Sequence, residues 1–272
     1  MCGSVMTSCS LLSQLAITTS LLTTVVPSAV QVYDAMVSEL PPVAFDMYIL
    51  AQSWQPAFCF NKETQYPGCR APQRYWRSHL TLHGLWPELS GSAPPSFCSS
   101  EAFDAEKIES ELGIDTLHEF WPDVKFSEAS PQYTDFWKHE WARHGTCSGL
   151  KQVEYFTSAI DLERNETLAP TPEPVQDNVG GHVDAQKLRE AFGDAALQCQ
   201  RSRDGDTYVT MFSQVFTCWH KDEHNVPTQR GACPPHIHSE DTCGKGTVSI
   251  PGFHVSDGDQ GQQDEMDSSE SS

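Results

Sequence analysis

A glutamate and a histidine, Glu140 and His144, stand four residues apart in the segment FWKHEWARHG. In a helix this spacing places both side chains on one face, where the carboxylate can orient the imidazole. Tyr133, Trp137 and Trp141 fall on the same face, so the pair is expected among apolar neighbours. A charge held there usually has a chemical task. The alternative is a core histidine at the end of a helix.

A second histidine, His83, ends the strand-like segment RSHLTLHGLW, in which Leu80 and Leu82 alternate with polar residues. Two histidines from distant segments, with a cation at Arg143, match what RNA cleavage by internal attack requires. One histidine removes the proton of the ribose 2′-hydroxyl, and the other protonates the 5′-oxygen leaving group. The cation offsets the charge that grows on the phosphorane oxygens.

The elements that must position these residues are predicted along the chain. The apolar and aromatic segment 45–59 predicts a strand. Capping serines, acidic residues and a final glycine predict a helix over 101–113. Ser130 and Pro131 predict the start of the helix that carries the Glu-His pair, and Gly145 predicts its end.

The charge and composition exclude several classes of protein. The chain has 272 residues, of which 38% are hydrophobic, as in an ordinary globular protein. Its net charge of -20 excludes a nucleic-acid binder that acts through a large basic surface. A polyanionic substrate would therefore be held by a few local cations. Protonation of the 11 histidines at acidic pH would offset part of this charge.

Cysteine usage and the N-terminal segment indicate an oxidising compartment. Of the ten cysteines, Cys2 and Cys9 lie near the N-terminus, and the even remainder predicts a disulfide framework. Residues 10–30 carry no charge, so we expect residues 1–29 to form a secretory signal peptide. No Lys or Arg precedes it. A signal anchor is the alternative, which Pro27 and the polar residues disfavour.

The rest of the chain predicts one catalytic domain and a tail. Residues 41–254 show no repeat of fixed period and no further membrane segment. Residues 255–272 are acidic and predict a solvated, disordered tail. Asn165 begins an acceptor sequence for N-glycosylation, which matters if the chain is secreted.

The segments LTLHGLWPE and FWKHEWARHGTC resemble the two active-site signatures of the ribonuclease T2 family, whose members are secreted or lysosomal-vacuolar ribonucleases. The similarity extends over about residues 45–250, through the strand with Trp54, the helix YFTSAIDL and the arrangement of cysteines. It implies an α+β fold, with a central antiparallel β-sheet flanked by helices, in a single domain stabilised by disulfides. It also implies secretion or a lysosomal or vacuolar lumen.

The resemblance also implies roles for individual residues. His83 resembles the general acid, His144 the general base, and Glu140 the residue that assists the phosphate and the neighbouring histidine. His139 resembles a contact to the substrate phosphate. Arg143 stands where the family usually has lysine, and a planar guanidinium keeps the charge but changes the shape. We expect retained activity.

Four further residues resemble the family's base-binding positions. Trp86 and Glu88 fall where the family holds the base 5′ to the cut, and Gln52 and Phe136 where it holds the following base. Enzymes that cut RNA stack unpaired bases on aromatic rings and read their edges with a few polar groups. The alternative for Trp86 and Phe136 is an ordinary place in the core.

Arithmetic cannot choose a connectivity for the remaining cysteines, which allow many pairings. The family pattern implies four disulfides, namely Cys59 with Cys69, Cys98 with Cys147, Cys199 with Cys243 and Cys218 with Cys233. The second of these would tie the end of the catalytic helix to the loop after the first signature.

The function expected from these observations is an endoribonuclease that cuts single-stranded RNA through a 2′,3′-cyclic phosphate to a 3′-phosphate. We expect no cofactor, no metal, no membrane contact and a monomer, and no protein partner can be inferred. One alternative is an RNA-binding or recognition protein on the same fold, weakened by Arg143. Another is a zinc-dependent hydrolase that uses the histidine-rich segment, with its ligands drawn from His220, His224, His236 and His238.

Overall fold

The computed structural model describes residues 44–253, so the expected signal peptide and the acidic tail lie outside the described residues. Its strands form one seven-stranded sheet. They are β1 (Met47–Ser53), β2 (Thr81–Glu88), β3 (Gly181–Asp184), β4 (Ala195–Asp204), β5 (Thr207–Lys221), β6 (Pro227–Arg230) and β7 (Thr247–Ile250).

The helices are mostly short. They are α2 (Gln55–Cys59), α3 (Pro67–Arg70), α4 (Ala105–Leu112), α5 (Ile114–Phe120), α6 (Asp135–Arg143), α7 (Gln152–Glu163), α8 (Glu173–Gln176), α9 (Ala185–Phe192) and α10 (Pro235–His238), with 3-10 turns at Tyr75–Arg77 and Gly145–Cys147. None of the helices between residues 44 and 253 is long and apolar enough to cross a membrane.

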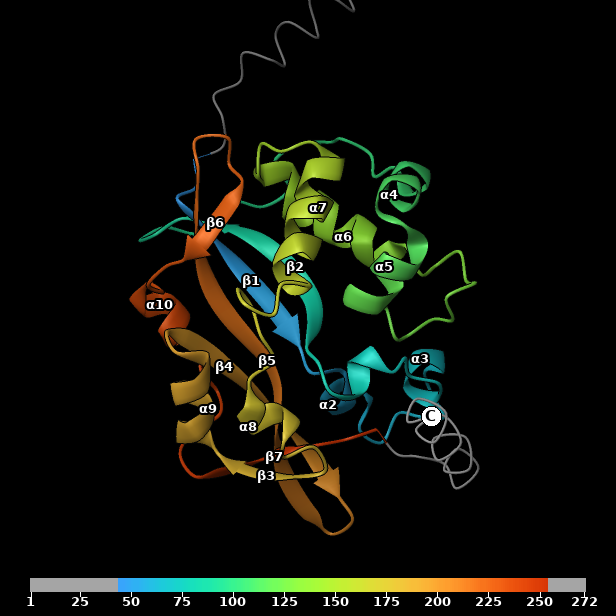
Figure 1. Cartoon of the computed structure of the whole chain (residues 1–272), viewed down its shortest axis with the longest axis vertical. Helices are drawn as coiled ribbons and strands as arrows, with labels where there is room; N and C mark the ends of the chain where they lie inside the picture. Colours follow the sequence, from blue (N-terminus) through green and yellow to red (C-terminus); the bar gives the residue numbers. More distant parts are fainter. Residues whose placement is uncertain (1–43, 254–272) are drawn as a thin grey trace, which may run out of the picture. The chain divides into compact units, whose positions relative to one another are not determined.

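The long strand β5 organises the sheet. The strand order is β2-β1-β5-β7-β3, and β4 and β6 also pair with β5. All pairings are antiparallel except the contact between β5 and β7. Figure 1 shows α4–α7 gathered beside β1 and β2, and α9 and α10 beside β4. The α+β fold implied by the resemblance is therefore confirmed.

β1 is buried on both faces because its side chains alternate between two apolar clusters. Tyr48 and Leu50 belong to the large cluster that also contains aromatic residues of α5–α7. Met47 and Ile49 belong to a smaller cluster on the other side, with Ile237 of α10. The sheet is therefore covered by helices α4–α7 on one face and by α10 on part of the other.

Hydrogen bonds from buried aromatic side chains join the helices to β2. The indole of Trp121 on the end of α5 donates to the carbonyl of His83 at 3.0 Å. The hydroxyl of Tyr155 on α7 donates to the carbonyl of Leu85 at 2.8 Å. The indole of Trp137 on α6 donates to the carbonyl of Trp121 at 2.8 Å. The strand and helix with the predicted catalytic residues are thus held together by side chains of the core.

Three predicted boundaries need correction. The strand predicted over 45–59 ends at Ser53, because a proline in the first turn of α2 lacks the N–H that a further strand pair needs. The helix predicted over 101–113 begins only at Ala105, where Asp104 caps it by accepting from the N–H of Lys107. Its predicted end at Gly113 is correct.

The helix with Glu140 also begins later than predicted. Ser130 and Pro131 lie in a turn, in which the N–H of Tyr133 bonds to the carbonyl of Ser130 at 3.0 Å. α6 starts at Asp135 and ends at Arg143. The local signal of a serine followed by proline therefore marked a turn before the helix and not the helix itself.

Four disulfides tie the described residues together, and they are the pairs that the resemblance implies: Cys59–Cys69, Cys98–Cys147, Cys199–Cys243 and Cys218–Cys233. Cys98–Cys147 joins the loop after β2 to the turn that follows α6.

Candidate active site

His83 occupies an irregularity in the pairing of β2 with β1. Gly84 pairs with Ala51, whereas Leu82 pairs with the next residue of β1, Gln52. His83 therefore has no partner of its own on β1. An extra residue of this kind breaks the alternation of faces and re-aims the side chain. The bulge is the local feature that turns the imidazole of His83 toward the cavity described below.

Two groups from other elements approach the imidazole of His83. Nδ1 lies 2.8 Å from the amide oxygen of Gln214 on β5, which places the Nδ1 proton on the histidine as a donor. Nε2 then faces Oε1 of Glu140 at 4.0 Å. Burial lowers the pKa of His83, and the hydrogen bond to Gln214 opposes this by favouring the protonated ring.

Glu140 is a buried carboxyl group on α6, with 2% of its surface exposed. Its Oε2 accepts a hydrogen bond of 2.9 Å from the indole N–H of Trp86. Burial raises the pKa of Glu140 to about 8, although the Trp86 hydrogen bond and the charge of Arg143 oppose the shift. Glu140 can therefore exchange a proton near neutral pH, which an exposed glutamate does not do.

His144 follows the last residue of α6, and its backbone N–H bonds to the carbonyl of Glu140 at 2.9 Å. Its ring stacks on the indole of Trp86, with centroids 5.1 Å apart. Burial, and then the charges of Arg143, His83 and His139, lower the pKa of His144 to about 3. The imidazole is therefore neutral over most of the pH range and can accept a proton.

These side chains line one cavity of about 800 Å³. The structure brings to it all but one of the site residues predicted from the sequence, namely His83, Trp86, Glu88, Phe136, His139, Glu140, Arg143 and His144. Such a volume is typical of a small-molecule or nucleotide site.

Gln52 is the exception, and its predicted contact with the substrate needs correction. Its side chain is buried and donates through Nε2 to Oε2 of Glu163 on α7, at 3.1 Å, and to the carbonyl of Ala169. Successive residues of a strand point to opposite faces. The adjacent Ser53, and not Gln52, lines a cavity near the catalytic histidines.

This second cavity, of about 260 Å³, was missed by the sequence analysis. His83, Phe136, Asp123 and Lys125 line both cavities, so the two adjoin. The second is otherwise mostly polar, with Ser53, Gln55, Gln200, Ser213 and Gln214 in its wall. The only local signal is a pair of polar residues within the apolar strand TMFSQVF, because the other residues come from separate segments.

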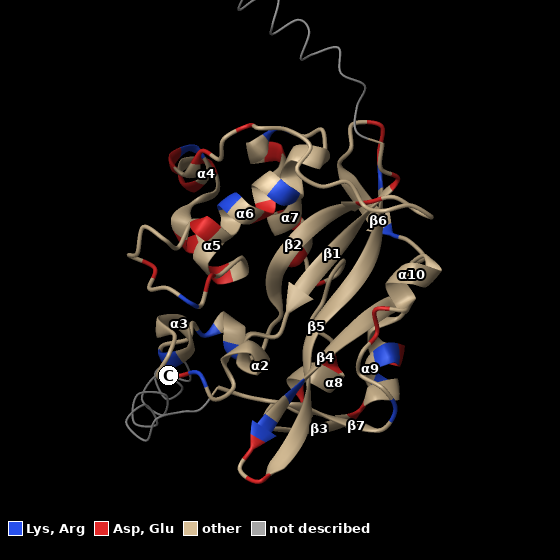
Figure 2. Ribbon diagram, turned by 180° about the vertical axis from the view of Figure 1, so that it is seen from behind, with Lys and Arg blue, Asp and Glu red and all other residues tan. Residues whose placement is uncertain are grey.

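The distribution of charge fits a site with local cations. Figure 2 shows acidic positions on α4 and α5, while Lys and Arg positions are scattered over the described elements without a continuous band. Arg143 and Lys125 both line the large cavity. Asp123, Asp135 and Glu240 also line this cavity, so an anionic ligand would be held locally, beside the two cations and the exposed His139.

The histidines considered for a zinc site have other neighbours. Nε2 of His236 lies 3.2 Å from Oε1 of Glu88, and Nε2 of His238 lies 2.8 Å from Oδ1 of Asp194. Between residues 44 and 253, no group of three or more His, Cys, Asp or Glu side chains is arranged to hold a metal ion.

Comparison with known proteins places the chain among RNA-cleaving enzymes. It is 33% identical over 188 residues to ribonuclease MC of Momordica charantia. This match covers 65% of this chain and 91% of the relative. It is 36% identical over 125 residues to ribonuclease T2 of Homo sapiens. This match covers 44% of this chain and 43% of the relative.

The solved structures agree. A crystal structure of RNase NT in complex with 5′-AMP matches with a TM-score of 0.61 and 25% sequence identity, covering 77% of this chain and 100% of that one. The sequence profile of the ribonuclease T2 family matches residues 45–229. The chain therefore belongs to the ribonuclease T2 family.

Proposed function

We propose that this protein is an endoribonuclease that cleaves single-stranded RNA by acid–base transesterification. The ribose 2′-oxygen attacks the adjacent phosphorus, the 5′-oxygen leaves, and the resulting 2′,3′-cyclic phosphate is hydrolysed to a 3′-phosphate. The observation that carries this proposal is the meeting of His83, His144 and Glu140 around Trp86 in one cavity.

His144 acts as the general base. Its low pKa leaves the ring neutral, which is the form that accepts the 2′-hydroxyl proton. A very low pKa also makes a weak base. A bound phosphodiester brings negative charge beside the ring, which raises the pKa of His144 toward the working pH.

His83 acts as the general acid. The amide oxygen of Gln214 accepts from Nδ1, so Nε2 is the nitrogen that carries the transferable proton toward the 5′-oxygen. The carboxyl group of Glu140 lies beside the same nitrogen and favours its protonated form when ionised. In the hydrolysis step the two histidines exchange roles, by microscopic reversibility.

The charge of the phosphorane is offset by the cations of the cavity. Arg143 supplies a guanidinium with several N–H donors for the non-bridging oxygens. His139, which lines the same cavity, contributes a further N–H donor. We assign the base 5′ to the cut to the wall with Trp86 and Glu88, and the following nucleotide to the second cavity, which Phe136 shares.

We further propose that the chain works in a secretory or lumenal compartment, as a monomer and without a cofactor. Four disulfides persist only where the environment is oxidising, and the uncharged N-terminal segment would direct the chain there. Asn165 is exposed just after α7, so it is accessible to glycosylation in such a compartment.

The experiment that tests the catalytic proposal is incubation of the full oxidised chain with a defined RNA oligonucleotide in chelator, from about pH 4 to about pH 8, the span in which histidine titrates. Mass analysis identifies the new ends. We expect 2′,3′-cyclic phosphates, formed fastest at acidic pH. Products with 5′-phosphate ends, or activity lost to the chelator, would contradict the proposal and favour a metal-dependent hydrolase.

Two variants and one control test whether cleavage needs both histidines. His83→Phe and His144→Phe should each lower cleavage by about a thousandfold or more, while circular dichroism shows a folded protein. His182→Ala, on the exposed part of β3, should leave cleavage unchanged. Intact RNA with the folded wild-type protein would support the alternative of an RNA-recognition protein.

A further inference from the structure

The short helix α10 lies against the part of the cavity that contains Trp86 and Glu88. Ile237 is buried in the cluster with Ile49, and Trp86 packs against the same cluster. Ile237 and Glu240 both line the large cavity. The histidine-rich segment is therefore a wall of this site.

His236 of α10 contacts Glu88 directly. Glu88 is 5% exposed, and its Oε1 accepts a hydrogen bond of 3.0 Å from the N–H of Leu89. Nε2 of His236 lies 3.2 Å from the same oxygen. Two N–H donors thus converge on Oε1. Within residues 44–253, no protein donor bonds to Oε2, so this oxygen remains available to a ligand in the cavity.

The segment that carries His236 is held firmly. α10 lies between Cys233 and Cys243, which form disulfides with Cys218 on β5 and Cys199 on β4. A side chain fixed in this way can act as a preorganised donor.

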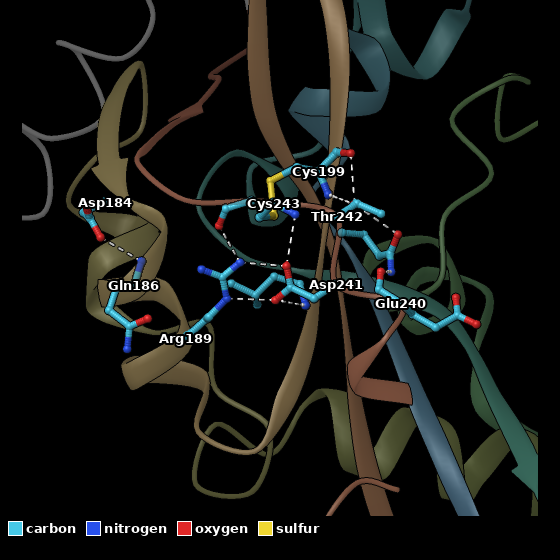
Figure 3. A network of polar contacts seen from close by, with 11 residues as sticks. Asp184, Gln186, Arg189, Cys199, Glu240, Asp241, Thr242 and Cys243 are labelled. Atoms are coloured by element: carbon cyan, nitrogen blue, oxygen red, sulfur yellow. Dashed lines mark hydrogen bonds and ion pairs between the residues drawn. A yellow bond between two sulfur atoms is a disulfide. The ribbon is translucent and has the colours of Figure 1, made fainter. Parts of the chain in front are cut away.

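An ion pair fixes the end of the same segment. Arg189 of α9 binds Asp241 through two hydrogen bonds of 2.9 and 2.7 Å and also reaches the carbonyl of Gly244 (Figure 3). The hydroxyl of Thr242 accepts from the N–H of Cys199 at 2.8 Å. The chain that follows α10 is therefore joined to both α9 and β4.

The contact between His236 and Glu88 affects which base the site binds, because the nucleobases differ in their hydrogen-bonding groups. An ionised carboxylate only accepts hydrogen bonds. The exocyclic amino groups of adenine (N6) and cytosine (N4) are donors, whereas guanine and uracil present carbonyl oxygens, O6 and O4, at the corresponding position. A carboxylate oxygen held toward that position would therefore accept from adenine and cytosine and would repel the carbonyl oxygen of guanine or uracil.

We propose that His236 is a positioning residue for base specificity. It holds Oε1 of Glu88, together with the N–H of Leu89, so that Oε2 accepts from the exocyclic amino group of the base 5′ to the cut. The site then takes adenine or cytosine in preference to guanine or uracil. This inference rests on the proposed ribonuclease function and on the placement of that base beside Glu88.

The test compares dinucleoside monophosphates that share the 3′ nucleoside and differ in the 5′ base, with four forms of the full oxidised chain. The forms are wild type, His236→Ala, His236→Gln and His238→Ala. Glutamine keeps an N–H donor of similar reach. His238 is the matched control, because it lies on the same helix with a similarly exposed side chain but pairs with Asp194.

We expect the ratio of kcat/KM for adenine or cytosine as the 5′ base over uracil to be about ten or more in the wild type and to fall about tenfold in His236→Ala. The change should reside mainly in KM. His236→Gln should restore most of the ratio, and His238→Ala should not alter it. Equal ratios in wild type and His236→Ala, or an equal loss in His238→Ala, would overturn the proposal.

Measuring nucleotide binding tests the role of His236 separately from the proposed ribonuclease function. Calorimetric titration with 3′-AMP and 3′-UMP requires no turnover. A preference for 3′-AMP that is lost in His236→Ala supports the role of His236, even if the protein cuts no RNA. Cleavage with the same base ratios and the same nucleotide affinities in every variant would support the ribonuclease and refute the role of His236.

Discussion

Trp86 donates its indole N–H to Oε2 of Glu140 at 2.9 Å, across 54 residues of sequence. The same indole stacks on His144 and meets the ring of His83 edge-on, each at a centroid distance of 5.1 Å. One aromatic side chain thus contacts all three proposed catalytic groups. Small displacements of Trp86 should therefore alter their relative geometry.

Gly84 should tolerate no side chain. A Cβ atom at this position would lie 2.1 Å from Oε2 of Glu140 and 2.3 Å from Nε1 of Trp86. Gly84→Ala must therefore push these two groups apart, and we expect kcat/KM on RNA to fall by about a hundredfold or more. Gly91→Asn is the control, since its Cβ meets nothing within 4 Å and asparagine tolerates a positive φ. Equal activity of Gly84→Ala and wild type would contradict the observed contact.

Glu140 should make stability depend on pH. Its carboxyl titrates near 4.5 in the unfolded chain and near 8 in the folded one, so the folded state binds more protons between these values. The contribution of Glu140 to the free energy of unfolding is then fully present below about pH 4.5 and is lost as the pH rises through 8. Glu140→Gln should remove this loss, which amounts to roughly a few kcal/mol.

Urea unfolding of the two proteins at several pH values measures the difference. The exposed Glu111→Gln on α4 is the control and should keep the wild-type profile. His144 contributes with the opposite sign between about pH 3 and pH 6.5, because burial lowers its pKa. Parallel profiles for wild type and Glu140→Gln would show that folding does not shift the pKa of Glu140.

Gln214 should set the alkaline limb of the activity profile. The proposed mechanism requires protonated His83, whose pKa is lowered by burial and raised by the hydrogen bond to Gln214. Activity therefore falls as the pH rises through the pKa of His83. Gln214→Leu removes the acceptor and should move this limb of the kcat/KM profile to lower pH by about half a unit or more. Gln186→Leu, on the surface of α9, should leave the limb in place.

Arg143 should be replaceable by lysine but not by a neutral residue. Its side chain lines the cavity near the proposed phosphate position, where a positive charge stabilises the transition state. We expect Arg143→Lys to keep kcat within about tenfold of wild type and Arg143→Gln to lower it by about a hundredfold. Lys138→Gln, exposed on the same helix, tests whether overall charge explains the effect. An equal loss in this control would count against a local role.

The sequence determined the residues to which we assign the chemistry, because side-chain type and spacing along one helix or strand are local properties. His83, Glu140 and His144 were predicted from their segments, and the structure brings them to one cavity. Helix and strand boundaries were less well predicted. The signal at Ser130 marked a turn, and the proline of α2 ended a strand that the apolar pattern would have continued.

Only the tertiary structure decided which side of each element faces the site. β1 is buried on both faces, so its sequence shows no polar side, and periodicity could not assign Gln52 to the core or Ser53 to a cavity. Gln214 contacts His83 across 131 positions of sequence, and His236 contacts Glu88 across 148 positions. Such contacts depend on how the sheet and its disulfides fold the chain, which no local pattern records.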